Sequence, residues 1–179
     1  VIIDASTEPG YATSPMVMPN GNASVSNVLT LSGASANGST VRGLAINNFT
    51  GYGIWITGSS NNLIVANYVG TDATGSSAVG TTVANGIALN NANNNVIGGS
   101  TAADRNLVAG NYYSGLLAFG GSTGNQILGN YFGINAAGTA KVGAANAQIE
   151  LDGPGNIVGG LSAGQGNVIA GQQKLANMD

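Results

Sequence analysis

An internal repeat constrains this chain more than any other feature. The phrase N-L-I-V-A-N-Y-V-G-T-D-A-T-G-S-S-A-V-G starts at Asn62 and returns 63 residues later, at Asn125, as N-Q-I-L-G-N-Y-F-G-I-N-A-A-G-T-A-K-V-G. A second phrase, N-V-I-G-G at Asn95 with R-N-L-V-A-G after it, returns 61 residues later at Asn156 as N-I-V-G-G with G-N-V-I-A-G after it. Self-similarity at a fixed period is typical of stacked structural units, each of which buries its apolar face against its neighbours.

Short apolar runs bounded by Gly and Asn form one strand family within the repeat. They are Val28–Leu31, Gly53–Ile56, Gly86–Leu89, Gly115–Phe119 and Gln148–Leu151, with starts 25, 33, 29 and 33 residues apart. Each run alternates and is too short for a helix. Two more short strands fit between neighbouring members, and in the third turn these are Asn95–Ile97 and Asn106–Ala109. Hairpins would need two-residue turns between antiparallel partners, so the pattern favours a coil with three strands per turn.

We therefore predict an all-β fold, a single-stranded right-handed parallel β-helix of about five turns with three short strands per turn. Members of the strand family should pair in parallel from one turn to the next. Residues 1–27 are expected to form an N-terminal turn or cap, and residues 28–171 the repeats. The tail, residues 172–179, is interpreted as either a cap or a truncation.

The composition excludes several classes of protein. Charged residues are only 6% of the 179 residues, but 43% are hydrophobic and the repeats keep register, so disorder is not expected. A net charge of −3 with four Lys and Arg in all cannot supply a phosphate-binding stripe, so no nucleic-acid partner is expected. No apolar run approaches the roughly 18 residues that span a bilayer, so no membrane insertion is expected. The lack of Cys permits a secreted or a cytosolic protein.

Several phrases resemble a known group of proteins. V-I-I-D-A-S-T-E-P-G-Y at Val1, V-R-G-L-A-I-N-N-F at Val41, N-Y-V-G-T-D-A-T-G at Asn67 and R-N-L-V-A-G-N at Arg105 are similar to the right-handed β-helix repeats of large bacterial secreted and cell-surface proteins, of the pectate-lyase-like superfold. The resemblance extends over nearly the whole chain to Gly171. It implies an extracellular or cell-surface location and a part in adhesins or surface assemblies, and it implies no defined biochemical activity.

Asparagine recurs at the strand starts in two columns. One column holds Asn62, Asn95, Asn125 and Asn156, and the other holds Asn67, Asn106, Asn130 and Asn167. Side-chain amides stacked on parallel, in-register strands can hydrogen-bond along the column. Asn also tolerates the left-handed backbone conformation that corners need. We therefore expect both columns to be structural and to bind no ligand.

The outer face of the first strand family is the candidate binding face. Alternation points the following residues inward: Ile54, Ile56, Ile87, Leu89, Leu116, Ala118, Ile149 and Leu151. On the outside, Trp55, Leu117 and Phe119 are expected to be exposed beside the carboxylates of Glu150 and Asp152. Aromatic side chains are natural platforms for flat ligands. Three interpretations stay open: a surface patch without function, a contact with protein (a loop or another molecule), and polysaccharide binding.

Glu150 and Asp152 are the minimum pair of carboxylates for glycoside hydrolysis. Polygalacturonases of this fold add N-T-D, D-D, G-H-G and R-I-K motifs, none of which is present, and the chain has no His. Pectate lyases need a Ca²⁺-binding carboxylate cluster with a basic residue nearby. The basic residues here are scattered along the chain: Arg42, Arg105, Lys141 and Lys174. Fold alone does not imply activity, so we expect no enzyme and no catalytic residue.

No metal or cofactor is expected either. Asp72 in the first long phrase becomes Asn135 in the second, which favours a turn-forming side chain over a Ca²⁺ ligand. The chain contains no Gly-Lys-Ser/Thr phosphate-binding loop. What remains is a structural or adhesive β-helix segment of an extracellular protein or filament, with a polysaccharide-binding or polysaccharide-cleaving module as the alternative. Its partners would be neighbouring repeats, a second copy stacked head to tail, or a polysaccharide.

Overall fold

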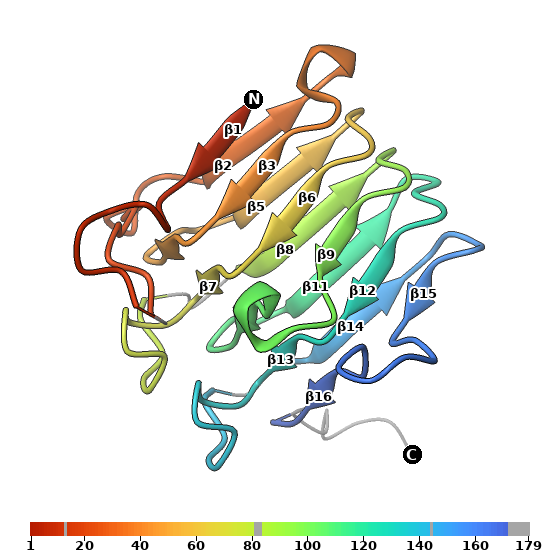
Figure 1. The fold of residues 1–179 in the computed structure, drawn as a ribbon. Coiled ribbons are helices and arrows are strands. Elements are labelled where there is room, and N and C mark those ends of the chain that lie inside the picture. The colour runs from red at the N-terminus through yellow and green to blue at the C-terminus, as the bar shows by residue number, and fades with distance from the viewer. Residues whose placement is uncertain (13, 81–83, 144, 172–179) are drawn as a thin grey trace, which may run out of the picture.

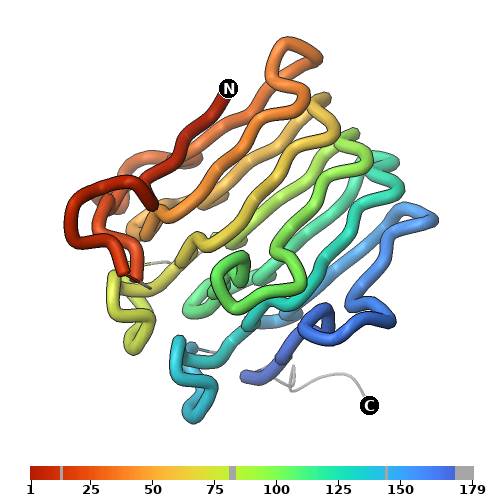
Figure 2. The backbone as a smooth tube through the Cα atoms, viewed as in Figure 1, coloured from red at the N-terminus to blue at the C-terminus, as the bar shows by residue number. Residues whose placement is uncertain are grey.

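The computed structural model of the chain describes residues 1–12, 14–80, 84–143 and 145–171. The backbone coils through three parallel sheets that run along the molecule (Figures 1 and 2). Sheet 1 contains β2 (Asn27–Ser32), β5 (Tyr52–Thr57), β8 (Asn85–Asn90), β11 (Ser114–Phe119) and β14 (Ala147–Leu151). Sheet 2 contains β1 (Ile2–Asp4), β3 (Thr40–Arg42), β6 (Leu63–Val65), β9 (Val96–Gly98), β12 (Gln126–Leu128) and β15 (Ile157–Val158). Sheet 3 contains β4 (Ala45–Ile46), β7 (Tyr68–Val69), β10 (Leu107–Val108), β13 (Tyr131–Phe132) and β16 (Val168–Ile169).

Within each sheet, every strand except the first and the last pairs with the strand one turn earlier and the strand one turn later. Ile87 of β8 lies opposite Ile54 of β5 and Leu116 of β11, and Leu116 lies opposite Ile149 of β14. All of these pairs are parallel, as the strand family predicted. The fold class is therefore confirmed as an all-β parallel β-helix with three strands per turn. Two short 3₁₀ helices, η1 (Ala34–Ala36) and η2 (Ala102–Asp104), lie in loops.

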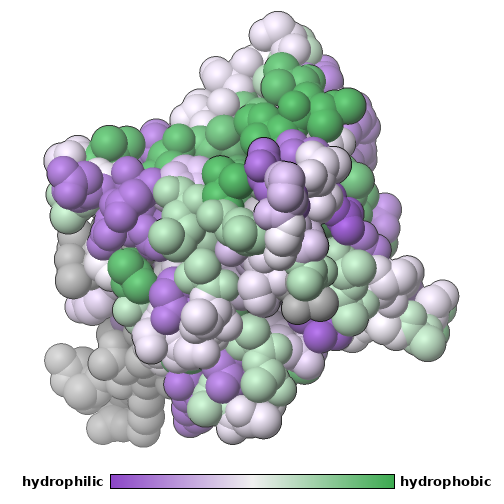
Figure 3. Space-filling view, turned by 60° about the vertical axis from the view of Figure 1, so that its left-hand side comes forward, coloured by the Kyte–Doolittle hydropathy of each residue, from purple (hydrophilic) through white to green (hydrophobic). Residues whose placement is uncertain are grey.

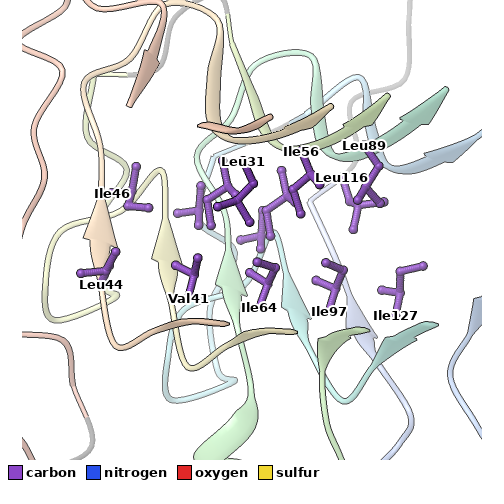
Figure 4. Packing of buried hydrophobic residues seen from close by; sticks show 14 of the residues in the cluster. Leu31, Val41, Leu44, Ile46, Ile56, Ile64, Leu89, Ile97, Leu116 and Ile127 are labelled. Carbon is purple, nitrogen blue, oxygen red and sulfur yellow. The ribbon is translucent and has the colours of Figure 1, made fainter. Parts of the chain in front are cut away.

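The core is a set of apolar columns between the sheets. Figure 4 shows Val41, Ile64, Ile97 and Ile127 of sheet 2 in one row, facing Leu31, Ile56, Leu89 and Leu116 of sheet 1. Ile64, Ile97 and Ile127 are 0% exposed. Because each turn contributes only one or two residues to a column, burial depends on the turns above and below.

Glycine is the second residue of β5, β8 and β11, because a Cβ at that position would point into the interior. A Cβ at Gly53 would come within 2.6 Å of Val69 Cγ1, and one at Gly86 within 2.6 Å of Val108 Cγ1. At Gly115 the added atom would lie 3.0 Å from Phe132 Cδ1. Distances of this size leave no room for a side chain between sheets 1 and 3.

Both asparagine columns form continuous hydrogen-bond ladders. Nδ2 of Asn62 donates to Oδ1 of Asn95 at 2.8 Å, and Nδ2 of Asn95 donates to Oδ1 of Asn125 at 2.9 Å. The second column repeats the pattern, since Nδ2 of Asn67 donates to Oδ1 of Asn106 at 3.2 Å and Nδ2 of Asn106 to Oδ1 of Asn130 at 3.0 Å. Each Oδ1 also accepts a backbone N–H from the preceding turn, so one buried amide satisfies several polar groups of a corner.

Residues 1–27 contribute to the first turn, since β1 pairs in register with β3 and Val17 and Asn20 form parallel bridges to the strand region around β4. At the other end, Ile149 and Leu151 were expected inside the core but are only half-buried, since no described turn covers them. The tail, residues 172–179, lies outside the described residues.

Candidate functional site

The aromatic strip predicted on sheet 1 exists, but its large side chains are half-buried rather than exposed. Trp55 packs against Tyr52 with ring centroids 4.0 Å apart and against Phe119 at 6.2 Å with a near-perpendicular ring. Leu117 is also half-buried, and Ala88 between them is only 1% exposed. Alternation predicts which face of the sheet a side chain lies on, but it does not predict which neighbours pack against that side chain. Here Tyr52 and Phe119 cover part of Trp55. Burial also raises the pKa of the Tyr52 hydroxyl.

Glu150 and Asp152 are both exposed at the edge of this strip. Oε2 of Glu150 accepts a hydrogen bond from Ser114 Oγ at 3.0 Å. Nothing in the described residues brings a basic side chain into contact with either carboxylate. The pair therefore lies beside the aromatic strip, as predicted, in an arrangement that fits a solvated surface.

The double variant Glu150→Gln, Asp152→Asn is expected to leave both the fold and any carbohydrate turnover unchanged. Both replacements keep the side-chain shape, and the amide in place of the Glu150 carboxylate would still offer an oxygen to Ser114. The measurement is a reducing-sugar assay on polyuronides with and without Ca²⁺, together with the melting temperature. Turnover by the parent that disappears in the double variant would contradict the expectation.

A second site was not anticipated and lies on the outer face of sheet 3. It is a pocket of about 750 Å³, within the range of roughly 300–1,000 Å³ that small-ligand pockets have. We call it the tyrosine pocket and define it by Tyr11, Arg42, Tyr68, Arg105, Leu107 and Tyr131. Tyr68, Leu107 and Tyr131 occupy equivalent positions of β7, β10 and β13 and form its floor.

The two arginines of the tyrosine pocket have different roles. Arg42 donates from Nη1 to Asp104 Oδ1 at 3.2 Å and from Nη2 to the Ala103 carbonyl at 3.1 Å. It thereby ties the η2 loop, which forms one wall, to β3 (Figure 1). Arg105 lies over the ring of Tyr131, 4.0 Å from its centroid, and donates from Nε to the Gly129 carbonyl at 3.1 Å. Arg42 and Arg105 are far apart in the sequence, and the fold brings both to this one pocket.

Two loops that recur every second turn pack on sheet 3 beside the pocket, and Ala136 of the second loop lines it. They stack on each other, because the Ala136 N–H donates to the Gly75 carbonyl at 3.0 Å. A Cβ at Gly75 would lie 2.6 Å from Leu107 Cδ2 and 2.9 Å from Tyr68 Cε2, so the loop rests directly on the pocket floor. The repeated A-x-G phrase therefore serves close packing of the loops on the tyrosines.

The acidic and amide side chains of these loops shape turns, as predicted for Asp72 and Asn135. Oδ1 of Asp72 accepts from Thr74 Oγ1 at 2.8 Å and from the Ser76 N–H at 3.0 Å. Partial burial alone would raise the pKa of Asp72, but these hydrogen bonds outweigh it and lower the pKa below its usual value. Oδ1 of Asn135 accepts the Thr139 N–H at 2.8 Å, which is the same turn with an uncharged acceptor.

Charges around the tyrosine pocket nearly cancel. Asp104 pairs with Arg42, and hydrogen bonds from Ser6 lower the pKa of Asp4, which pairs in register with Arg42. Burial raises the pKa of the Tyr11 hydroxyl above its usual value. Within the described residues, no three His, Cys, Asp or Glu side chains gather where they could hold a metal ion.

The repeat contained one signal for this pocket. In N-Y-V-G and N-Y-F-G the apolar residue after Tyr points inward, so alternation puts both tyrosines on the outside, in one column. The walls could not be found this way, since they come from loops without periodicity. The chain matches no protein-family model, no curated protein and no solved structure. Across the described residues, no helix is long and apolar enough to cross a membrane.

Proposed function

We propose that this chain is a non-catalytic structural or adhesive segment of an extracellular or cell-surface β-helix protein, and that it stacks end to end on another copy of itself. The observation that carries the proposal is the last described turn. Val158 is 44% exposed and Ile169 is 50% exposed, although the residues they pair with, Ile127 and Phe132, are 0% exposed. The apolar columns thus reach the end of the described helix without a cover, and another turn would bury them.

The hydrogen-bond ladders are open at the same end. The backbone N–H groups of Asn125 and Asn130 donate to Oδ1 of Asn156 and Asn167, respectively. The N–H groups of Asn156 and Asn167 themselves have no acceptor among the described residues. A further parallel turn with an acceptor at each corner would satisfy both groups.

At the opposite end, the first described strand also leaves apolar side chains exposed. Val1 and Ile2 are 70% and 78% exposed, and β1 pairs with β3 on one side only. Figure 3, in which the left-hand side of Figure 1 is turned forward, shows apolar residues gathered mainly toward the top of the view. Contact between two different ends is heterologous and propagates into a filament unless the geometry closes a ring. The extracellular part of the proposal is supported by the resemblance of the repeat phrases.

Ile169→Lys and Val158→Lys are expected to abolish self-association, because each places a charge in an apolar column at the stacking surface. Sedimentation velocity over a concentration series should show larger species for the parent and monomer for both variants. Leu63→Lys is the matched control, since Leu63 is an exposed aliphatic residue on the side of sheet 2 rather than at an end. A parent that stays monomeric at every concentration would refute the proposal.

A further inference from the structure

Sheet 1 has an open edge at β14. Within the described residues, β14 is the last strand of this sheet and pairs with β11 on one side only. Its inward residues, Ile149 and Leu151, are half-buried. The residues opposite them in β11, Leu116 and Ala118, are 0% exposed. An edge strand presents unpaired backbone N–H and C=O groups that can pair with an added strand. β14 therefore offers both a backbone edge and an apolar face that one more strand would cover.

Head-to-tail stacking of two copies would leave this edge open. The chain passes through sheet 1, sheet 2 and sheet 3 in turn, so β14 is followed by β15 and then β16. The first strand of the next copy, β1, belongs to sheet 2, and its first strand of sheet 1 is β2. If that β1 pairs with β15, the next copy's β2 lies two strand spacings from β14, about 10 Å away. A junction built from the described residues thus has room for one further strand in sheet 1.

The outer face of β14 determines which kind of strand fits there. Glu150 lies opposite Leu117 in β11, Asp152 comes directly after β14, and both acids are exposed. Within the described residues, neither carboxylate pairs with a basic side chain. Opposite charges that face each other on neighbouring strands are favourable, and like charges are unfavourable. The edge therefore favours a strand that carries Lys or Arg opposite both carboxylates, and it disfavours pairing with the β14 edge of another copy.

We propose that β14 is a docking site for one extended segment in which aliphatic and basic residues alternate. The segment pairs parallel to β14 and in register with it, as β11 does on the other side. Its aliphatic side chains cover Ile149 and Leu151, and its basic side chains lie opposite Glu150 and Asp152. Main-chain hydrogen bonds provide affinity and the alternating side chains provide specificity, which is the general mode of peptide recognition by strand addition. The site lies at the end proposed for stacking, but docking does not require that copies stack.

The test is fluorescence anisotropy of a labelled peptide with the sequence N-G-I-K-L-K, which follows the N-G-I-A-L-N of β8 and places Lys at the two outward positions. Both the parent and the Ile169→Lys variant are titrated, because residue 169 lies on sheet 3 and its replacement leaves β14 intact. We expect saturable binding to both proteins. Binding to a parent that stays monomeric would refute stacking alone, and stacking without peptide binding would refute docking alone.

Two further peptides test charge and alternation separately. The charge-reversed peptide N-G-I-E-L-E should bind at least about tenfold more weakly than N-G-I-K-L-K, because it places like charges opposite Glu150 and Asp152. The reordered peptide N-G-I-L-K-K has the same composition without the alternation and should also bind at least about tenfold more weakly. Backbone hydrogen exchange should slow in residues 147–152 when N-G-I-K-L-K binds, and it should not change in residues 27–32 at the other edge of sheet 1.

The double variant Glu150→Lys, Asp152→Lys is expected to reverse the preference, so that N-G-I-E-L-E binds at least about tenfold more tightly than N-G-I-K-L-K. Glu8→Lys is the control, because Glu8 is an exposed acid in the loop between β1 and β2 and its replacement should leave the preference unchanged. Melting temperatures verify that each variant folds. The proposal is overturned if N-G-I-K-L-K does not bind at millimolar concentration, if N-G-I-E-L-E binds the parent equally well, or if binding protects residues 27–32 instead of 147–152.

Discussion

Ile64→Asp is expected to leave the chain unfolded under conditions in which Leu63→Asp folds. The two residues are neighbours on β6, but Ile64 is 0% exposed and Leu63 is 38% exposed. Ile64 lies in the column between Val41 and Ile97 of the adjacent turns. The carboxylate would therefore sit between two layers of the core with no partner.

The expected size of the effect comes from two terms. Removing a buried aliphatic side chain costs about 2–5 kcal/mol, and burying an unpaired carboxylate adds several kcal/mol or forces its protonation. Together these approach the whole stability of an ordinary domain, about 5–15 kcal/mol. Because each turn is stabilised by its neighbours, the defect disrupts both sides of the β-helix.

Circular dichroism and urea unfolding of the two variants check this prediction. Leu63→Asp should lose no more than about 1 kcal/mol, since residue 63 lies on the outer face, where water still reaches the carboxylate. A cooperatively folded Ile64→Asp variant with near-parental stability would show that the inward column is assigned incorrectly.

The β-helix could be predicted from the sequence because its physical causes are local and periodic. Gly53, Gly86 and Gly115 recur where a side chain would meet the opposite sheet, and alternation after them gives the inward columns. Asparagine recurs where one side-chain amide hydrogen-bonds to neighbouring turns. Every turn has the same close approach between sheets and the same corner hydrogen bonds, so the same residue types recur at each turn.

The functional surfaces were predicted less well, for equally physical reasons. Alternation places Trp55 on the outside of sheet 1, but only the folded chain brings Tyr52 and Phe119 over it. The tyrosine pocket draws its walls from the first loop, β3 and η2, whose juxtaposition follows no period. Arg42 and Arg105 are 63 positions apart in the sequence and line one pocket because the loop with η2 lies against Arg42 at the end of β3.

Asn106→Ala is expected to cost much more stability than Asn167→Ala, although the two side chains make nearly the same hydrogen bonds. Oδ1 of Asn106 accepts the Asn67 N–H at 3.0 Å, and its Nδ2 donates to the Ile64 carbonyl at 2.7 Å. Asn106 is 0% exposed. Its loss would leave both partners unpaired inside the β-helix, where water cannot replace the amide.

Asn167 is the matched control at the open end of the same ladder. Its Oδ1 accepts the Asn130 N–H at 2.8 Å, and its Nδ2 donates to the Ile127 carbonyl at 2.7 Å, but the residue is only half-buried. Each of the two buried groups left unpaired costs about 1–3 kcal/mol, so Asn106→Ala should lose about 2–6 kcal/mol. Asn167→Ala should lose about 1 kcal/mol, because solvent reaches the groups it exposes. Urea unfolding of both variants measures the two free energies of unfolding. Equal losses would mean that the asparagines stabilise the fold through the backbone conformation of the corners rather than through buried hydrogen bonds.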